Sequence, residues 1–304
     1  MLALLSVVAC GRVGFDALAR DAGGTDATRL DGAPPEVGGR DAGAAEDAGA
    51  ADAGPLDAGK PPAADCLLPG ATGPVLLYTM DGAGTPVVEV DRASRPPDVD
   101  LTPEPREPSG LAYSGSGSML FSGGHLAATS ADSAVLAAAL EAAESVTVEL
   151  WIADGLADQD GPARILSLSR DSASQAFVVA REDQDLHIRL RTSITNESGD
   201  GYRGIGMSAF PMTAPTHVVF KFDGSDGVLW TYVDGEPVHV ITHIGLDGSL
   251  GALDFTAGGD RLGMGDEFVD PRPWAGEIHR VAIYDRALVH AEIACFTAAG
   301  PSGP

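Results

Sequence analysis

The most regular feature of the chain is an alternation of apolar and polar residues in short runs from residue 75 onward. Side chains on a β-strand point to opposite faces in turn, so a period of two predicts strands with one buried face. In one run, for example, Val218, Phe220 and Phe222 share a face. The runs that we expect to form strands are 75–80, 118–122, 145–152, 186–192, 217–222, 229–234 and 276–284.

The segments between these runs contain turn signals and little helix. Asp234-Gly235 follows a run directly and predicts a type I′ hairpin, because that turn needs two positive φ angles. Residues 287–296 favour a short helical segment, and the Ala- and Leu-rich stretch 134–144 favours a helical turn or a loop. Many short strands without long helices between them indicate an antiparallel β-sandwich.

The alternation is absent from residues 11–65, which differ in composition from the rest. Of these 55 residues, 15 are Ala, 11 Gly, 9 Asp and 5 Pro. Such a segment cannot bury enough apolar surface to offset its ordering entropy, so we expect a disordered acidic linker. As a coil it would span roughly 40 Å. Its five Asp-Ala-Gly triplets lack the fixed spacing of a calcium loop and fit a solvated tether better.

The first ten residues are apolar and end at Cys10. The sequence Val-Val-Ala-Cys at 7–10 resembles the cleavage site of a bacterial lipoprotein signal, whose cysteine is lipidated after processing. The stretch is short and lacks a basic start, so a disordered apolar N-terminus is the alternative. Gly11 after the cysteine permits an outer-membrane destination in that family. The expected domains are therefore a signal segment at 1–10, a tether at 11–65 and a folded domain at 66–304.

The charge of the folded domain excludes two classes of partner. Residues 66–304 carry 33 acidic and 14 basic side chains, a net charge of −19. Such a surface has few cations to replace phosphate counterions and is repelled by anionic lipids, so nucleic acid and electrostatic membrane binding are not expected. There is no run of 18 apolar residues, so a lipid anchor would be the only membrane link.

The order of motifs along the domain resembles the laminin-G-like jelly roll of the concanavalin A-like lectin/glucanase superfamily. The most specific match is Thr-His-Val-Val-Phe-Lys-Phe-Asp-Gly-Ser from 216, followed by Leu-Trp-Thr-Tyr-Val-Asp-Gly ending at 235. The other matching segments are 78–84, 117–124, 145–151, 261–265 and 274–293. The resemblance implies an all-β fold, a two-sheet antiparallel jelly-roll sandwich.

This family contains lectins, adhesion modules and glycosidases, so the fold alone does not give the function. Hydrolases that the domain resembles carry Glu-x-Asp-x-x-Glu on one strand, which places two carboxylates on one face about 5–5.5 Å apart. Here Glu144 and Glu149 are five residues apart, on opposite faces of a regular strand. We therefore expect a protein that is not an enzyme. A glycoside hydrolase of the same superfamily is the third hypothesis, after the two non-catalytic functions given below.

Calcium is the cofactor that the resemblance allows. Relatives read Ile-Asp-Glu-Val on the last long strand, where this chain has His279 in place of the aspartate ligand. Asp154, Asp158 and Asp160 lie in an acidic loop that could supply oxygen ligands instead. The alternative is that these carboxylates are simply solvated.

The resemblance also bears on Cys66 and Cys295, which flank the domain. The first and last strands of such sandwiches lie close together, and an exported compartment is oxidising, so a disulfide between them is expected. Two buried or mobile thiols are the alternative.

For the function, we expect a lipid-anchored recognition module, exported to the outer membrane or cell surface, that binds carbohydrate or a glycoprotein. A structural or protein-adhesion module without a glycan site is the nearest alternative. Rings that stack on sugars and nearby hydrogen-bonding side chains would form the site, although such rings are often core residues. The candidates are Trp151, Trp230, Tyr232 and Trp274, with Glu149 and Arg191 as polar partners.

Overall fold

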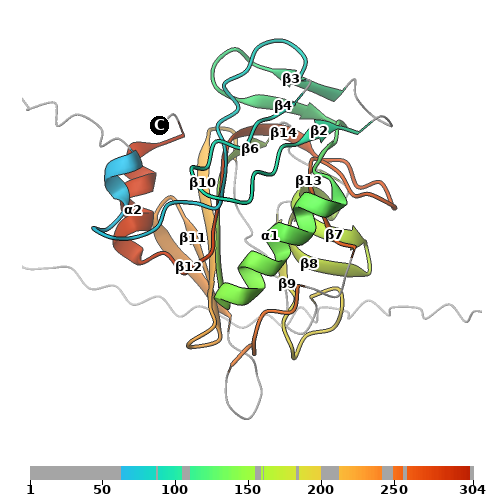
Figure 1. The fold of residues 1–304 in the computed structure, drawn as a ribbon. Helices are drawn as coiled ribbons and strands as arrows, with labels where there is room; N and C mark the ends of the chain where they lie inside the picture. The colour runs from blue at the N-terminus through green and yellow to red at the C-terminus, as the bar shows by residue number, and fades with distance from the viewer. Residues whose placement is uncertain are drawn as a thin grey trace, which may run out of the picture. The chain divides into compact units, whose positions relative to one another are not determined.

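The computed structural model describes residues 63–86, 88–104, 110–154, 159, 161–182, 185–199, 212–241, 249–255 and 259–301. These residues form two antiparallel β-sheets, one of eight strands and one of six, which confirms the predicted sandwich (Figure 1).

The larger sheet has the order β12-β11-β10-β6-β14-β4-β3, and β1 also pairs with β14. Its strands are β1 (Leu76–Tyr78), β3 (Leu111–Tyr113), β4 (Met119–Ser122), β6 (Ser145–Asp154), β10 (Thr216–Asp223), β11 (Val228–Val233), β12 (Glu236–Ile241) and β14 (Ala275–Tyr284). The first and last strands are neighbours, because β1 pairs with β14 from Leu76 opposite Ile283.

The smaller sheet has the order β2-β5-β13-β7-β8-β9. Its strands are β2 (Thr102–Pro103), β5 (Leu126–Ala127), β7 (Ala163–Asp171), β8 (Ser174–Glu182), β9 (Asp185–Leu190) and β13 (Arg261–Met264). The pattern did not predict β7 and β8 because both are buried over nearly their whole length, which removes the alternation of apolar and polar positions.

The core lies between the sheets, and α1 (Ser130–Ala143) contributes to it. This helix contacts β6 of the larger sheet and β13 of the smaller one, and it buries Leu136 and Leu140 in the core. The sequence predicted only a helical turn or a loop here. A full helix forms because Thr129 accepts a hydrogen bond from the Asp132 amide at 3.1 Å and a run of Ala and Leu follows.

A second apolar cluster lies outside the larger sheet, under α2 (His290–Ala299). In Figure 1, α2 lies beside the short helix η1 (Ala63–Cys66) on the side of β10–β12. The disulfide predicted between Cys66 and Cys295 joins the two helices, with 5.3 Å between the Cα atoms. None of the helices in the described ranges is long and apolar enough to cross a membrane.

The predicted hairpin between β11 and β12 is confirmed, since Asp234 and Gly235 have φ angles of 47° and 84°. The prediction for Glu144 was wrong. This residue does not lie on β6 but caps α1 in the left-handed region, with φ 52°. Glu144 is the single residue between the end of α1 at Ala143 and the start of β6 at Ser145, so strand periodicity does not apply to it.

Candidate functional site

The outer face of the larger sheet holds most of the predicted ligand-binding residues. On β6 the core takes Val146, Val148, Leu150 and Ile152, so Glu149 and Trp151 point outward. Across the sheet, Glu149 pairs in register with Val219 on β10, and Trp151 pairs with His217.

Part of this face is a buried polar cluster, which we define as Glu149, His217, Arg280 and Tyr284. Glu149 Oε1 lies 3.4 Å from His217 Nε2 and 3.7 Å from Arg280 Nε. The Tyr284 hydroxyl donates to Glu149 Oε2 at 3.0 Å. The Glu149 side chain is only 1% exposed, so its charge is compensated by protein groups rather than by water.

Burial and pairing oppose each other at Glu149. Burial alone raises the pKa of its carboxyl group, whereas the contacts with His217 and Arg280 lower it by more, so the pKa lies below the ordinary value. Burial, together with the charge of Glu149, raises the pKa of Tyr284 well above its ordinary value. At neutral pH the cluster therefore holds a carboxylate and a protonated phenol.

Helix α2 covers this cluster. The Thr297 hydroxyl and His217 Nδ1 are 2.7 Å apart, and the Arg280 guanidinium lies 6.0 Å from the centre of the Phe296 ring. The Trp151 ring stacks on His217 with a centroid distance of 4.7 Å and is only 6% exposed. Glu149 and Trp151 therefore present almost no surface to a ligand in this structure.

The same face is open further along, at the end of the sheet formed by β11 and β12. Trp230 is partly exposed there and stacks on Tyr232 with 6.4 Å between ring centroids. Tyr232 stacks in turn on His290, the first residue of α2, at 5.8 Å. Val240 pairs with Trp230 and is 42% exposed. Lys221 Nζ lies 5.9 Å from the centre of each of the two rings on β11.

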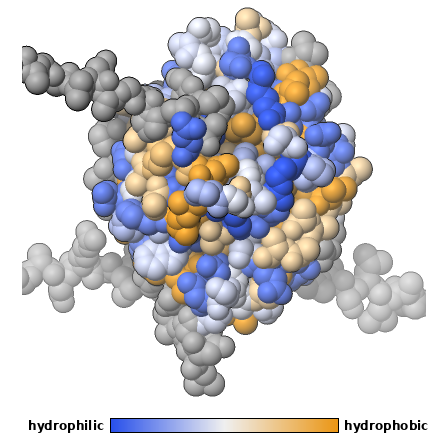
Figure 2. Space-filling view, turned by 60° about the vertical axis from the view of Figure 1, so that its left-hand side comes forward, coloured by the Kyte–Doolittle hydropathy of each residue, from blue (hydrophilic) through white to orange (hydrophobic). Residues whose placement is uncertain are grey.

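We call this surface the Trp230 patch and define it as Lys221, Trp230, Val240 and His290. Tyr232, between Trp230 and His290 in the stack, is only 4% exposed and belongs to the apolar cluster under α2. Figure 2 brings this side of the molecule forward and shows hydrophobic residues next to hydrophilic ones on the surface. Of the three tryptophans in the chain, Trp230 alone is not buried. The patch combines a partly exposed ring, an apolar neighbour and a cation, which are groups that can bind a ligand.

The remaining two candidates lie elsewhere. Trp274 is fully buried in the core, 5.8 Å from the Phe121 ring, so the prediction of a ligand contact there was wrong. Arg191 is also buried, and its guanidinium donates to Asp260 at 2.9 Å. An arginine that neutralises a buried carboxylate has a structural role, so Arg191 offers no surface to a ligand either.

Most of the predicted calcium loop lies outside the residues that the structure describes. Asp158 and Asp160 are outside the described residues, and the side chain of Asp154 is not described. Within the described ranges, no three His, Cys, Asp or Glu side chains come close enough to hold a metal ion. His279 lies with Nε2 3.6 Å from Glu277 Oε2, and burial lowers the pKa of its imidazole.

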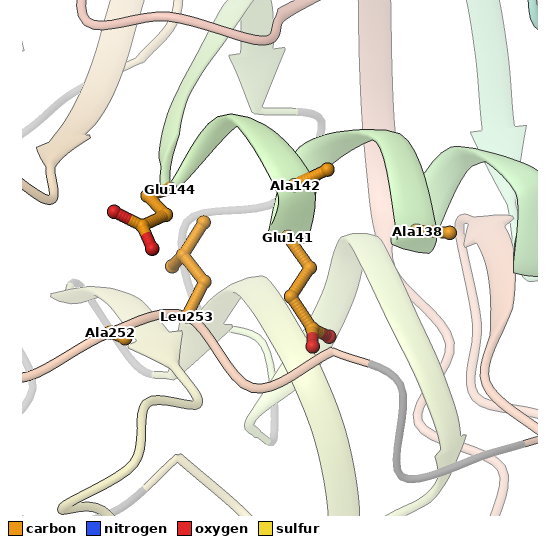
Figure 3. Close-up of a pocket in the computed structure, with 6 residues that line it drawn as sticks. All are labelled: Ala138, Glu141, Ala142, Glu144, Ala252 and Leu253. Atoms are coloured by element: carbon orange, nitrogen blue, oxygen red, sulfur yellow. The ribbon is translucent and has the colours of Figure 1, made fainter.

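A pocket of about 360 Å³ opens beside the C-terminal end of α1. Figure 3 shows Glu141 and Glu144 extending from the helix toward Ala252 and Leu253 on the facing segment. Glu141 Oε2 accepts a hydrogen bond from the Phe255 amide at 2.9 Å, which fixes one side of the pocket. The described residues that line the pocket are therefore three alanines, one leucine and two glutamates, and none of them carries a ring.

The ligand-binding residues predicted from the sequence do not include Lys221, His217, Arg280, Tyr284 or His290. The alternation in β10 carried a signal for two of them, because it places His217 and Lys221 on the outer face, opposite Val218 and Phe220. The other three depend on pairing between distant strands and on the position of α2, which one sequence does not specify.

Comparison with known proteins supports the fold. A laminin G family model, described as the concanavalin A-like lectin/glucanases superfamily, matches residues 124–294. No curated protein sequence matches the chain. Among solved structures, the binding domain of botulinum neurotoxin serotype D/C is similar, with a TM-score of 0.51 and 13% identity over 73% of this chain and 51% of that one.

Two further structures are similar at lower scores. Sialidase of Trypanosoma rangeli in complex with sialic acid has a TM-score of 0.48 and 14% identity, over 74% of this chain and 32% of that one. Domain 4 of AbnA, an extracellular arabinanase of Geobacillus stearothermophilus, in complex with arabinotriose, has a TM-score of 0.48 and 15% identity, over 73% of this chain and 97% of that one. The chain thus spans about a third of the sialidase and half of the neurotoxin domain.

The family match covers more than half of the chain, including most strands of both sheets. The chain therefore belongs to the laminin G-type domains of the concanavalin A-like lectin/glucanase superfamily.

Proposed function

We propose that this protein is a non-catalytic recognition module that binds carbohydrate or a glycoprotein and is displayed at the cell surface by a lipid anchor. The observation that carries the proposal is the Trp230 patch, a partly exposed ring with a cation beside it on a domain of the lectin/glucanase superfamily. The binding domain of botulinum neurotoxin, which shares the fold, was solved in complex with a ligand named SialylT.

The patch suits a sugar ring because of its mixed chemistry. A pyranose has an apolar C–H face and a rim of hydroxyl groups, so it needs an exposed ring with a few polar groups beside it. Trp230 supplies the ring and Val240 extends the apolar surface. Lys221 supplies an ammonium group 5.9 Å from the centre of the Trp230 ring, and His290, which stacks on Tyr232, supplies ring nitrogens.

The position of the carboxylates supports binding without catalysis. A retaining glycosidase needs two carboxyl groups about 5–5.5 Å apart and open to the substrate. Glu149, on β6, is buried under α2 and contacts His217 and Tyr284, and Glu144 caps a helix. The reaction would therefore need carboxylates from elsewhere in the chain.

A glycan array on the whole soluble domain tests the binding, run once with calcium and once with a chelator. We expect a specific signal that falls at least tenfold in Trp230→Ala, because a central exposed tryptophan usually dominates such a contact. Val135→Ala is the matched control, since Val135 is an apolar side chain on α1 that is 55% exposed. No signal at high protein concentration would reject glycan binding and favour the adhesion module, whereas turnover of an arrayed glycan would favour the glycosidase.

The lipid anchor rests on the sequence at Cys10, which lies outside the described residues. Metabolic labelling with a fatty acid in a bacterial host should label the full chain but not the Cys10→Ser variant. A labelled Cys10→Ser protein, or an unlabelled full chain, would overturn this part of the proposal and leave the ligand surface untouched.

A further inference from the structure

Lys221 is the only lysine between residues 66 and 304. It lies on the outer face of β10, next to Trp230 in the pairing of β10 with β11. Its Nζ donates one hydrogen bond, to the Leu288 carbonyl oxygen at 3.1 Å, and lies 5.9 Å from the ring centres of Trp230 and Tyr232. An ammonium group has three donors, so two of them have no protein partner among the described residues, beside the partly exposed ring.

The lysine differs from most cations of the domain in having no carboxylate partner. Among the described residues, no Asp or Glu oxygen lies within 4 Å of Lys221 Nζ. Eight arginines, by contrast, each have a carboxylate within that distance: Arg92, Arg95, Arg164, Arg170, Arg191, Arg261, Arg280 and Arg286. The domain has more than twice as many acidic as basic residues. A cation that has no carboxylate partner among the described residues, next to a partly exposed ring, is therefore available to pair with an anionic ligand.

We propose that the ligand of the Trp230 patch is a saccharide with an isolated anionic group, which pairs with Lys221 while a sugar ring lies on Trp230. This inference rests on the proposed function and deepens it. A cation that is already partly desolvated by two rings gains from a charge-assisted hydrogen bond with an anion.

The charge of the domain limits how many anionic groups the ligand carries. With a net charge of −19 on residues 66–304, the protein repels a densely charged polyanion at long range. One lysine compensates one charge. The domain should therefore prefer a sparsely charged saccharide over both a neutral one and a heavily sulfated polymer.

A lysine at this position does not distinguish between kinds of anion. A guanidinium forms a planar fork that matches a carboxylate in two parallel hydrogen bonds, whereas an ammonium acts as a compact point charge. The Lys221 ammonium group can therefore donate hydrogen bonds to either a carboxylate or a sulfate. Both sources have to be tested.

The experiment measures the affinity of the folded domain for four probes by calorimetry. These are a glucose disaccharide, the same disaccharide with one glucuronic acid, the same disaccharide with one 6-sulfate, and heparin. The expected result is that the singly charged disaccharides bind about fivefold more tightly than the neutral one, the size of one partly exposed ion pair. Heparin should bind more weakly than either.

Variants assign the preference to Lys221. Lys221→Met keeps the aliphatic stem and should reduce the ratio of charged to neutral affinity to about one, whereas Lys221→Arg should retain most of it. The matched control is Arg170→Met, which removes one positive charge from an exposed side chain on β7 of the other sheet. It should leave the ratio unchanged.

The outcomes separate this inference from the proposed function. If the neutral and charged disaccharides bind alike, or if Lys221→Met keeps the ratio, the inference is wrong and glycan recognition stands. Tightest binding of heparin would also overturn it. If no saccharide binds, the proposed function fails and the inference fails with it.

Discussion

Trp151 and Trp230 lie on the same face of the same sheet but in different surroundings. Both point outward, on β6 and β11, two strands that are separated only by β10. Trp151 is stacked on His217, which contacts both α2 and the buried carboxylate of Glu149, and is 6% exposed. Trp230 keeps one part of its ring open and has a lysine beside it.

The difference shows that the outward direction of a side chain does not make it a surface residue. Helix α2, more than 50 residues further along the chain, covers part of this face. Its apolar side packs on Val219, Tyr232 and Tyr284, and its Thr297 reaches His217. This part of the face is a second core, and Trp230 lies at its margin, partly exposed.

The largest effect should come from the disulfide that ties η1 to α2. It closes a loop of 229 residues, and in the chain-entropy model its removal costs up to roughly 5 kcal/mol of unfolding free energy. A Cys66→Ser, Cys295→Ser double variant, unfolded in urea, measures this loss. Hydrogen exchange should show that α2 opens before the sheets do, and equal protection of α2 in both proteins would contradict its dependence on the disulfide.

The two tryptophans should differ when each is truncated. Trp151→Ala leaves a cavity beside His217 and should lower the unfolding free energy by about 3–5 kcal/mol. Trp230→Ala removes a partly exposed ring and should cost about 1 kcal/mol or less. Equal losses in thermal or urea unfolding would mean that the two parts of the face are alike, against the structure.

The buried polar cluster should depend on the charge of Glu149. Glu149→Gln leaves the positive charge of Arg280 uncompensated and should lower the unfolding free energy by about 3 kcal/mol at neutral pH. Glu144→Gln, at the exposed end of α1, is the matched control and should change it by less than about 0.5 kcal/mol.

The pH dependence gives a smaller and more specific effect. The pKa of Glu149 is lower in the folded protein than in the unfolded one, so its stabilisation is present above its ordinary pKa and is lost as the pH falls through the folded value. The stability difference between the native protein and Glu149→Gln should therefore shrink from about pH 7 to about pH 3. Raised carboxyl pKa values, such as that of Glu89, act in the opposite direction but cancel in this difference. A difference that stays constant with pH would contradict the lowered pKa.

Much of the fold followed from local patterns. Strand β9, which has one buried face, showed its alternation in the sequence. The Asp234-Gly235 turn followed from backbone sterics. Strands β7 and β8 were not predicted, because burial on both faces removes the polar positions. The full length of α1 was not predicted, because its cap at Thr129 lies before the Ala-rich stretch.

The candidate site was harder to predict. The sequence placed Trp151, Trp230, Tyr232 and Glu149 in one set of candidates, and the structure puts all four on one face. The sequence could not show that Trp151 is buried or that α2 covers the polar cluster around Glu149, because both depend on packing between distant segments. Nor could it single out Lys221, whose lack of a carboxylate partner is a three-dimensional property.

The indole N–H signals of the three tryptophans test the central claim most directly. In a nitrogen–proton NMR titration with a glycan ligand of the domain, the account predicts that the Trp230 signal shifts, disappears in Trp230→Ala and is accompanied by little change at Trp151 and Trp274. A shift confined to Trp151 would place the ligand on the buried part of the face. Together with an unmoved Trp230 signal, that result would contradict the account.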